Sequence, residues 1–155
     1  WGKDEDNLTE NFQALINIDP KKNLIFSVHL YWKENTVQEL TDRLDRLIEK
    51  VINQNIPLII GEGPQLKGGS DRIDWPWEYT IAKCQQSEIG WLTWSWGKVV
   101  NGDCTETGVY DLTTDGIFGN WKTPFAEGIV ISDPNSIKNT SVKPKSLTKV
   151  KNSKR

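Results

Sequence analysis

The sequence has no methionine, one histidine and only two cysteines, Cys84 and Cys104. The cysteines show no CxxC spacing, so a structural metal site built from cysteine and histidine is not expected, and no cofactor motif replaces it. A disulfide between the two cysteines would suit an exported protein, but two free thiols fit the sequence as well. The sequence therefore predicts neither a metal nor a cofactor and leaves the state of the thiols open.

Long apolar runs are also missing. No stretch approaches the length of a membrane span, and no charged-then-apolar signal segment opens the chain. A chain of 155 residues with 36% hydrophobic and 26% charged residues suits one soluble domain with a core of its own. Because the chain begins at Trp1 and contains no initiator, we expect it to be processed or to be the later part of a longer product.

Negative charge is absent from the end of the chain. From residue 136 onward there are seven basic side chains and no acidic one, which leaves 12 basic and 21 acidic side chains, a net charge of −9, over residues 1–135. An acidic body argues against nucleic acid as the main partner. The basic end is poor in large apolar residues, so we expect residues 133–155 to form a largely disordered tail.

The hydrophobic pattern alternates between helical and strand periods. Apolar residues at spacings of three and four predict four helices, near residues 8–16, 36–51, 76–86 and 121–130. Shorter apolar stretches predict three strands, at residues 24–32, 58–62 and 90–96. Thr36 and Glu39 have the spacing of a capping box at the start of the second helix. Strands that alternate with amphipathic helices imply right-handed crossovers and a parallel α/β sheet.

Polar and aromatic side chains gather where these predicted strands end. His29 and Tyr31 share one face of the first strand, Glu62 ends the second, and Trp94 and Trp96 lie late in the third. Because parallel strands bring their carboxyl ends to one edge, we expect these five residues to lie together there. Aromatic faces beside a carboxylate and hydrogen-bond donors suit a sugar ring.

Four stretches carry a family resemblance: FSVHLYW, LIIGEGP, GWLTWSWG and GVYDLTTDGIFGNW. In this order they resemble the later half of a glycoside hydrolase family 5 enzyme, with the bacterial β-mannanases closest and the endoglucanases next. The resemblance covers roughly residues 1–130. It implies that residues 1–132 are the C-terminal part of a (β/α)8 barrel, with the three strands as strands six to eight.

The resemblance also implies an activity and residue roles. Such enzymes are secreted glycosidases that cleave β-1,4-linked polysaccharides, mannan or glucan, with retention of configuration. Glu62 would be the nucleophile, Tyr31 would orient that carboxylate, and His29 would help position the acid/base and the sugar. Trp94 would form the floor of the subsite at the cleaved bond. Trp96 would be either a further aromatic wall or a packing residue.

Two departures from the family pattern stand out. Gly63 and Pro64 follow Glu62, where the family has an aromatic residue and a glycine, so the shape of the loop after the nucleophile is open. A retaining glycosidase also needs a second carboxyl group about 5 Å from the first. The family places it in an Asn-Glu-Pro motif, which this sequence lacks. We therefore expect the chain alone to be inactive and to need the N-terminal half of the barrel.

Two other functions fit the same residues. A non-catalytic half-barrel that binds carbohydrate would use the same aromatic edge without a second carboxylate. An unrelated open α/β domain that binds a small ligand would need a different strand order, and the sequence has no GxGxxG or phosphate loop to support it.

Overall fold

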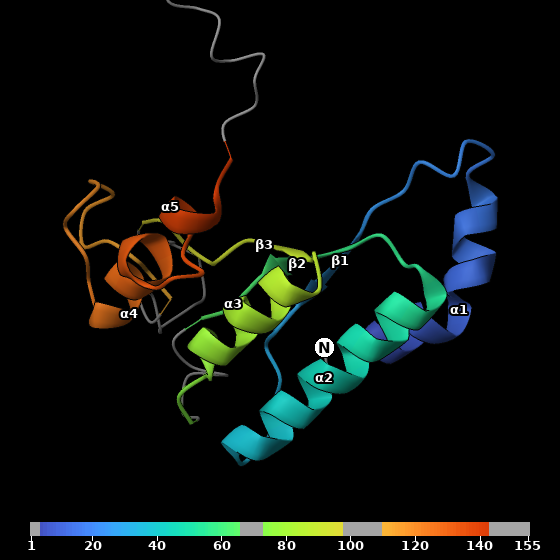
Figure 1. Cartoon of the computed structure of the whole chain (residues 1–155), viewed down its shortest axis with the longest axis horizontal. Coiled ribbons are helices and arrows are strands. Elements are labelled where there is room, and N and C mark those ends of the chain that lie inside the picture. Colours follow the sequence, from blue (N-terminus) through green and yellow to red (C-terminus); the bar gives the residue numbers. More distant parts are fainter. Residues whose placement is uncertain (1–3, 66–72, 98–109, 143–155) are drawn as a thin grey trace, which may run out of the picture.

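A computed structural model of the chain describes residues 4–65, 73–97 and 110–142. Its elements are, in order, α1 (Asp4–Ile18), β1 (Phe26–His29), α2 (Val37–Gln54), β2 (Leu58–Glu62), α3 (Trp77–Gln86), β3 (Gly90–Trp91), α4 (Pro124–Glu127), the π-helical turn η1 (Gly128–Ser132) and α5 (Ile137–Thr140) (Figure 1). Within the described residues the strands form one parallel sheet in the order β1-β2-β3. The sequential order of parallel strands confirms the predicted α/β alternation.

Helix α2 forms where the periodicity predicts it. Thr36 caps its start: the Thr36 hydroxyl accepts from the Glu39 backbone N–H, and the Glu39 carboxylate accepts from the Thr36 N–H. These two bonds complete the predicted capping box. The helix ends at Asn55, whose left-handed φ of 52° turns the chain toward β2. Its apolar stripe is buried, as predicted, and consists of Leu40, Leu44, Leu47, Ile48 and Val51.

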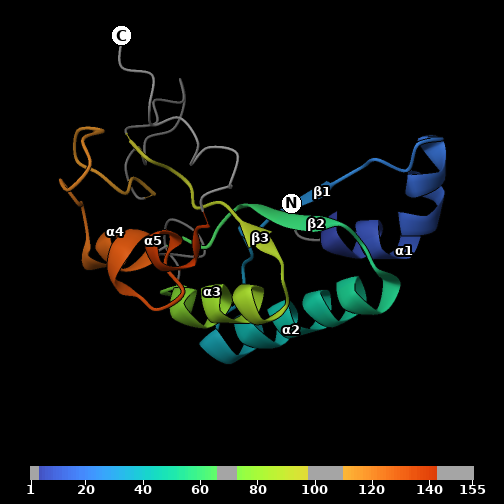
Figure 2. The ribbon, with the colours of Figure 1, turned by 45° about the horizontal axis from the view of Figure 1, so that its top comes forward.

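The helices cover one face of the sheet. Figure 2 shows α2 and α3 beneath the strands, with α1 beside α2. The residues of β1 and its extension that face these helices, Val28, Leu30 and Trp32, are buried in the core. In the described part of the chain no helix covers the opposite face, which carries His29 and Tyr31. Parallel strands inside and helices outside are the arrangement of a section of a (β/α)8 barrel wall.

A second, smaller hydrophobic core is formed by α4, η1, α3 and Leu112. Thr123 caps α4 and Pro124 occupies its first turn, as the sequence predicts, and α4 continues directly into η1. Phe125, Ala126, Ile129 and Val130 pack there with Ile81 of α3 and Leu112. One expectation is wrong for residues 133–142: they are not disordered, because Ser136 is fully buried and α5 packs on η1. The remainder of the predicted tail lies outside the described residues.

Two strands are shorter than predicted. Strand β1 covers four of the nine residues expected, although the Leu30 N–H still donates to the Glu62 carbonyl beyond its end. Strand β3 covers only Gly90 and Trp91. After Leu92 the backbone leaves β2 and pairs with the segment that begins at Tyr110: the Ser95 N–H donates to the Tyr110 carbonyl, and the Leu112 N–H donates to the Ser95 carbonyl.

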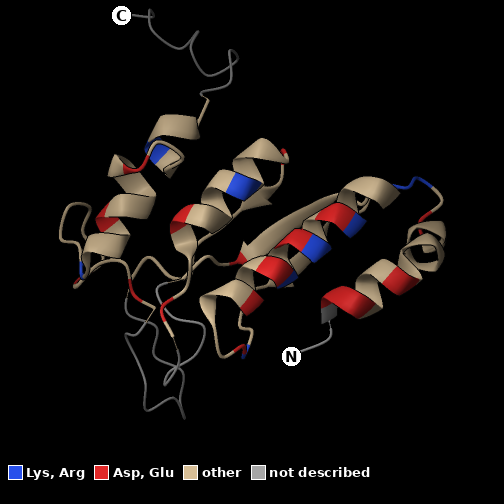
Figure 3. Cartoon of the chain, turned by 60° about the horizontal axis from the view of Figure 1, so that its bottom comes forward, with Lys and Arg blue, Asp and Glu red and all other residues tan. Residues whose placement is uncertain are grey.

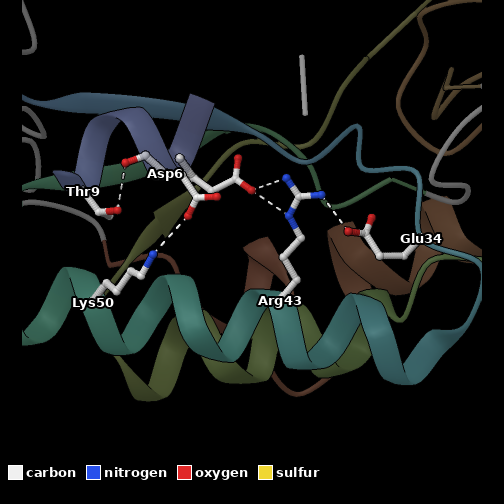
Figure 4. Close-up of polar contacts among 6 residues, drawn as sticks. Asp6, Thr9, Glu34, Arg43 and Lys50 are labelled. Atoms are coloured by element: carbon white, nitrogen blue, oxygen red, sulfur yellow. Dashed lines mark hydrogen bonds and ion pairs between the residues drawn. The ribbon is translucent and has the colours of Figure 1, made fainter. Parts of the chain in front are cut away.

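A network of charged side chains ties the loop after β1 to two helices. The Arg43 guanidinium on α2 donates to Glu5 on α1 and to Glu34 in the loop, with 2.6 Å between Nη1 and the Glu34 Oε1 (Figure 4). The Arg43 guanidinium carbon also lies 4.4 Å from the Trp32 ring centroid. Burial favours the neutral form of Arg43, but the hydrogen bonds to Glu34 and Glu5 prevail and raise its pKa.

Acidic and basic residues alternate along α2 (Figure 3). None of the described helices is both long and apolar enough to cross a bilayer. Cys84 is buried on α3 with a free thiol. Cys104 lies outside the described residues.

Candidate active site at the carboxyl ends of the strands

A bulge in the β1–β2 pairing brings Glu62 to the face of His29. The strands run in register from Phe26 opposite Leu58 to Val28 opposite Ile60, and the next pair is His29 opposite Glu62. Gly61 is therefore the extra residue. A Cβ at Gly61 would lie 1.9 Å from the Ser27 Oγ, so only glycine fits there without a shift. Since side chains alternate between faces, the bulge turns Glu62 onto the face of His29 and Tyr31.

Tyr31, His29 and Glu62 are in contact. The Tyr31 hydroxyl donates to the Glu62 Oε2 over 2.7 Å, and the His29 Nδ1 lies 3.5 Å from the same oxygen. Glu62 is 26% exposed and His29 37%, so both remain accessible from solvent. Burial, followed by the hydrogen bond to Glu62, raises the pKa of Tyr31 well above its usual value. The phenol therefore stays protonated and keeps donating to the carboxylate.

The loop after Glu62 is tied to the strands on both sides. On the β1 side the Glu62 carbonyl accepts from the Leu30 N–H, and the Gln65 side chain donates to the Leu30 carbonyl. On the β3 side the Gly63 N–H donates to the Leu92 carbonyl over 2.9 Å. The Thr93 hydroxyl donates to the Pro64 carbonyl over 2.8 Å. The loop whose shape the sequence left open is thus fixed on either side of the carboxylate.

Trp94 lies on the extension of β3, two residues beyond the Leu92 carbonyl that accepts from Gly63. Its side chain is 38% exposed. Among the described residues no hydrogen bond or ring contact joins it to Glu62, His29 or Tyr31. The structure thus places Trp94 at the predicted edge with an accessible indole, without a direct contact to the carboxylate.

Trp96 belongs to a different group of side chains. Its ring stacks on Phe118 with 6.2 Å between centroids and meets Trp121 edge-on at 6.0 Å, and its indole N–H donates to the Gly116 carbonyl. Trp96 remains 43% exposed. The aromatic cluster of Trp96, Phe118 and Trp121 therefore holds this indole in place. None of the ring contacts or the hydrogen bond described for Trp96 involves Glu62, His29, Tyr31 or Trp94.

Among the described residues no second carboxylate hydrogen-bonds to Glu62, His29 or Tyr31. Asp111, whose side chain is 7% exposed, lies 3.5 Å from Lys122 in an ion pair. Glu34 is held by Arg43. No cluster of three or more histidine, cysteine or acidic side chains suited to a metal occurs in the described part of the chain. The edge therefore presents one accessible carboxylate, oriented by a phenol.

Comparison with known proteins decides the family. The family model described as Cellulase (glycosyl hydrolase family 5) matches residues 1–99. The chain belongs to glycosyl hydrolase family 5. It is 30% identical over 150 residues to a mannan endo-1,4-beta-mannosidase of Cellvibrio japonicus, which covers 92% of this chain and 30% of that protein. It is 33% identical over 119 residues to a mannan endo-1,4-beta-mannosidase of Salipaludibacillus agaradhaerens, a match that covers 74% of this chain and 34% of that protein. The chain thus spans about a third of the length of these curated relatives.

Solved structures of family 5 mannanases share the fold. The catalytic domain of the mannanase from Streptomyces sp. SirexAA-E superposes with a TM-score of 0.71 at 25% identity, over 92% of this chain and 41% of that one. The β-mannanase from Streptomyces thermolilacinus superposes with a TM-score of 0.70 at 26% identity, over 93% of this chain and 44% of that one. The three β/α units described above are therefore part of a (β/α)8 barrel.

Sequence reasoning missed three features of this family 5 site. The predicted strand at residues 58–62 gives no sign of the bulge at Gly61, which sets the direction of Glu62. Nothing in the sequence indicates that the Tyr110 ring meets Tyr31 edge-on at 5.6 Å. The third feature is the Gln65 side chain. Its polar side chain directly after a Gly-Pro pair is the one signal in the sequence that could have drawn attention to this loop.

Proposed function

We propose that this chain carries the nucleophile side of a retaining glycoside hydrolase that cleaves β-1,4-linked polysaccharide. The observation that supports this best is the 2.7 Å hydrogen bond from Tyr31 to Glu62 at the carboxyl ends of parallel strands. A carboxylate that is accessible, yet held by a single donor, is free to use its other oxygen on an anomeric carbon. β-Mannan is the favoured substrate, because the relatives named above are mannan endo-1,4-beta-mannosidases; β-glucan is next.

Each predicted site residue has a role in this proposal. Glu62 attacks the anomeric carbon and forms a glycosyl-enzyme, while Tyr31 holds its Oε2 and keeps the carboxylate oriented. His29, 3.5 Å from the same oxygen, orders that side of the site and the sugar hydroxyls. The accessible indole of Trp94 provides an apolar face on which the sugar ring packs. Trp96 serves as an outer aromatic wall, braced by its stacking on Phe118.

Hydrolysis also requires a general acid about 5 Å from the nucleophile. Since no described carboxylate adjoins Glu62, we assign that group to the part of the barrel that completes the sheet beyond β1 and β3. The chain alone is then inactive. Because the substrate is a polymer, the enzyme acts outside the cell.

The test combines this chain with the portion of the Streptomyces thermolilacinus β-mannanase that it does not match, by fusion or by co-expression. Release of reducing sugar from β-1,4-mannan and from carboxymethylcellulose is measured for the combination and for the chain alone. We expect hydrolysis of mannan by the combination only, abolished by Glu62→Gln and unaffected by Glu49→Gln, an exposed glutamate on α2. Hydrolysis that survives Glu62→Gln would contradict the role of Glu62, and robust hydrolysis by the chain alone would contradict the need for a second part.

The single carboxylate at the edge also suits a second function, binding of glycan without turnover. In that case the combination would bind mannan oligosaccharides with an affinity that Trp94→Ala reduces, and it would release no sugar. The same assay therefore separates the two functions.

A further inference from the structure

The backbone hydrogen bonds between β1 and β2 lack one N–H donor at residue 64, two positions after Glu62. In parallel pairing, a residue that donates its N–H to residue j of the neighbouring strand accepts at its carbonyl from the N–H of residue j+2. The Leu30 N–H donates to the Glu62 carbonyl over 2.9 Å. The Leu30 carbonyl should therefore accept from residue 64. That residue is Pro64, which has no N–H to give.

The side chain of Gln65 fills this position. Its Nε2 donates to the Leu30 carbonyl over 2.5 Å, and the residue is fully buried. Gly63 leaves the space for it: its φ of 126° lies in the region that favours glycine, and a Cβ there would come 3.0 Å from the Gln65 Oε1 and from the Leu30 Cβ. Gly63, Pro64 and Gln65 thus act together, with the side-chain amide replacing the backbone bond that proline removes.

Packing alone does not account for a glutamine at this site. The Gln65 Oε1 is buried and has no hydrogen-bond partner among the residues that the structure describes. A buried acceptor without a partner costs stability, whereas an apolar side chain of the same length would avoid that cost. Glutamine is favourable here only if the hydrogen bond from its Nε2 to the Leu30 carbonyl contributes more stability than the buried Oε1 costs. We therefore attribute the role of Gln65 to its Nε2 donor.

We propose that Gln65 is a positioning residue for the Tyr31–Glu62 pair. Leu30 directly precedes Tyr31, so the bond from Gln65 to Leu30 fixes the backbone that carries the phenol relative to the strand that carries Glu62. Without this bond, the backbone of Leu30 is held to the Glu62 strand through its N–H and no longer through its carbonyl as well. The catalytic meaning of this positioning rests on the proposed function, but the positioning itself does not depend on hydrolysis.

The first experiment uses the unmodified chain. The Gln65 side-chain amide protons should exchange with water at least about tenfold more slowly than those of Gln38 and Gln85, which are exposed, and Gln65 Nε2 should show scalar coupling across the hydrogen bond to the Leu30 carbonyl carbon. Exchange at the rate of the exposed glutamines would overturn the proposal. Because no residue is changed, this measurement does not depend on the folding of a variant.

The second experiment follows the phenols by NMR with tyrosine labelled at the ring carbon that bears the hydroxyl. In Gln65→Met, which keeps the side-chain length, the Tyr31 resonance should move in the same direction as in Glu62→Gln. The Leu30 amide should exchange about tenfold faster. Tyr79 provides an internal control, because its hydroxyl also donates to a carboxylate, Asp45, at 2.7 Å, and its resonance should not move.

Two results would overturn the proposal: a Tyr31 resonance in folded Gln65→Met that coincides with the unmodified chain, or an equal shift in the control Gln86→Met on α3. Neither result bears on mannan hydrolysis. If the hydrolysis assay fails while the Tyr31 resonance moves as expected, the positioning stands and the proposed function falls.

Discussion

Removing the Arg43 guanidinium should destabilise the fold by a predictable amount. Arg43→Met keeps most of the aliphatic stem over Trp32 but leaves Glu5 and Glu34 without their shared cation. Breaking a fully buried ion pair from one side costs about 3–5 kcal/mol, because a buried charge loses its partner. Here the side chains of Arg43, Glu5 and Glu34 are 16%, 9% and 19% exposed, so water screens part of that cost.

We therefore expect a loss of about 2–3 kcal/mol from the ion pairs and a further loss of about 0.5–1 kcal/mol from the cation–π contact. For a domain of this size, about 3 kcal/mol corresponds to a fall in Tm of about 6–12 °C. Urea unfolding followed by tryptophan fluorescence measures the loss of free energy, and thermal unfolding followed by circular dichroism measures the fall in Tm.

Arg46→Met is the matched control. Arg46 lies one turn further along α2 with an exposed side chain, and its replacement should change the free energy of unfolding by less than about 0.5 kcal/mol. If Arg43→Met unfolds at the same urea concentration as Arg46→Met, the network in Figure 4 does not stabilise the loop after β1, and this reasoning is refuted.

Two further predictions concern packing. Gly61→Ala should destabilise by about 1–3 kcal/mol in urea, because its Cβ meets the Ser27 Oγ, and Ser27→Ala should relieve part of the loss. Gly90→Ala should change the free energy of unfolding little, because the nearest atom to its Cβ, the Ile59 Cγ2, lies 3.4 Å away. Equal losses of stability for the two substitutions would contradict the close approach of the strands at the bulge. Burial raises the pKa of the Cys84 thiol to about 12, so in a Cys104→Ser background it should react with a thiol reagent at pH 8 slowly when folded and rapidly in urea. Equal rates would show that Cys84 is not buried.

The sequence predicted those parts of the fold that depend on local pattern. The stripe and capping box of α2 follow from spacings within one helix. The placement of Tyr31, His29 and Glu62 at one edge of the sheet follows from the geometry of parallel strands. The length of β3 could not be predicted, because the segment after Leu92 pairs with residues near Tyr110, and no local pattern reports that pairing.

Two details of the site also depend on distant contacts. The neighbouring parallel strand β1 brings the Ser27 Oγ against Gly61 at the bulge, which the run of apolar residues in β2 does not reveal. The ion pair of Glu34 could not be predicted either, because the Arg43 that binds it lies nine residues away on another element. In both cases the sequence shows the residue, and the fold supplies its partner.

The role of Glu62 is tested most directly by trapping the glycosyl-enzyme. The assembled barrel is incubated with a 2-deoxy-2-fluoro-β-mannoside that carries an activated leaving group, and the labelled peptide is sequenced by mass spectrometry. Because the fluorine slows hydrolysis of the intermediate, a retaining mechanism should leave one sugar on the Glu62 side chain and none in Glu62→Gln. A sugar attached to a different carboxylate would contradict the account, as would mannan hydrolysis by the assembly that leaves Glu62 unlabelled.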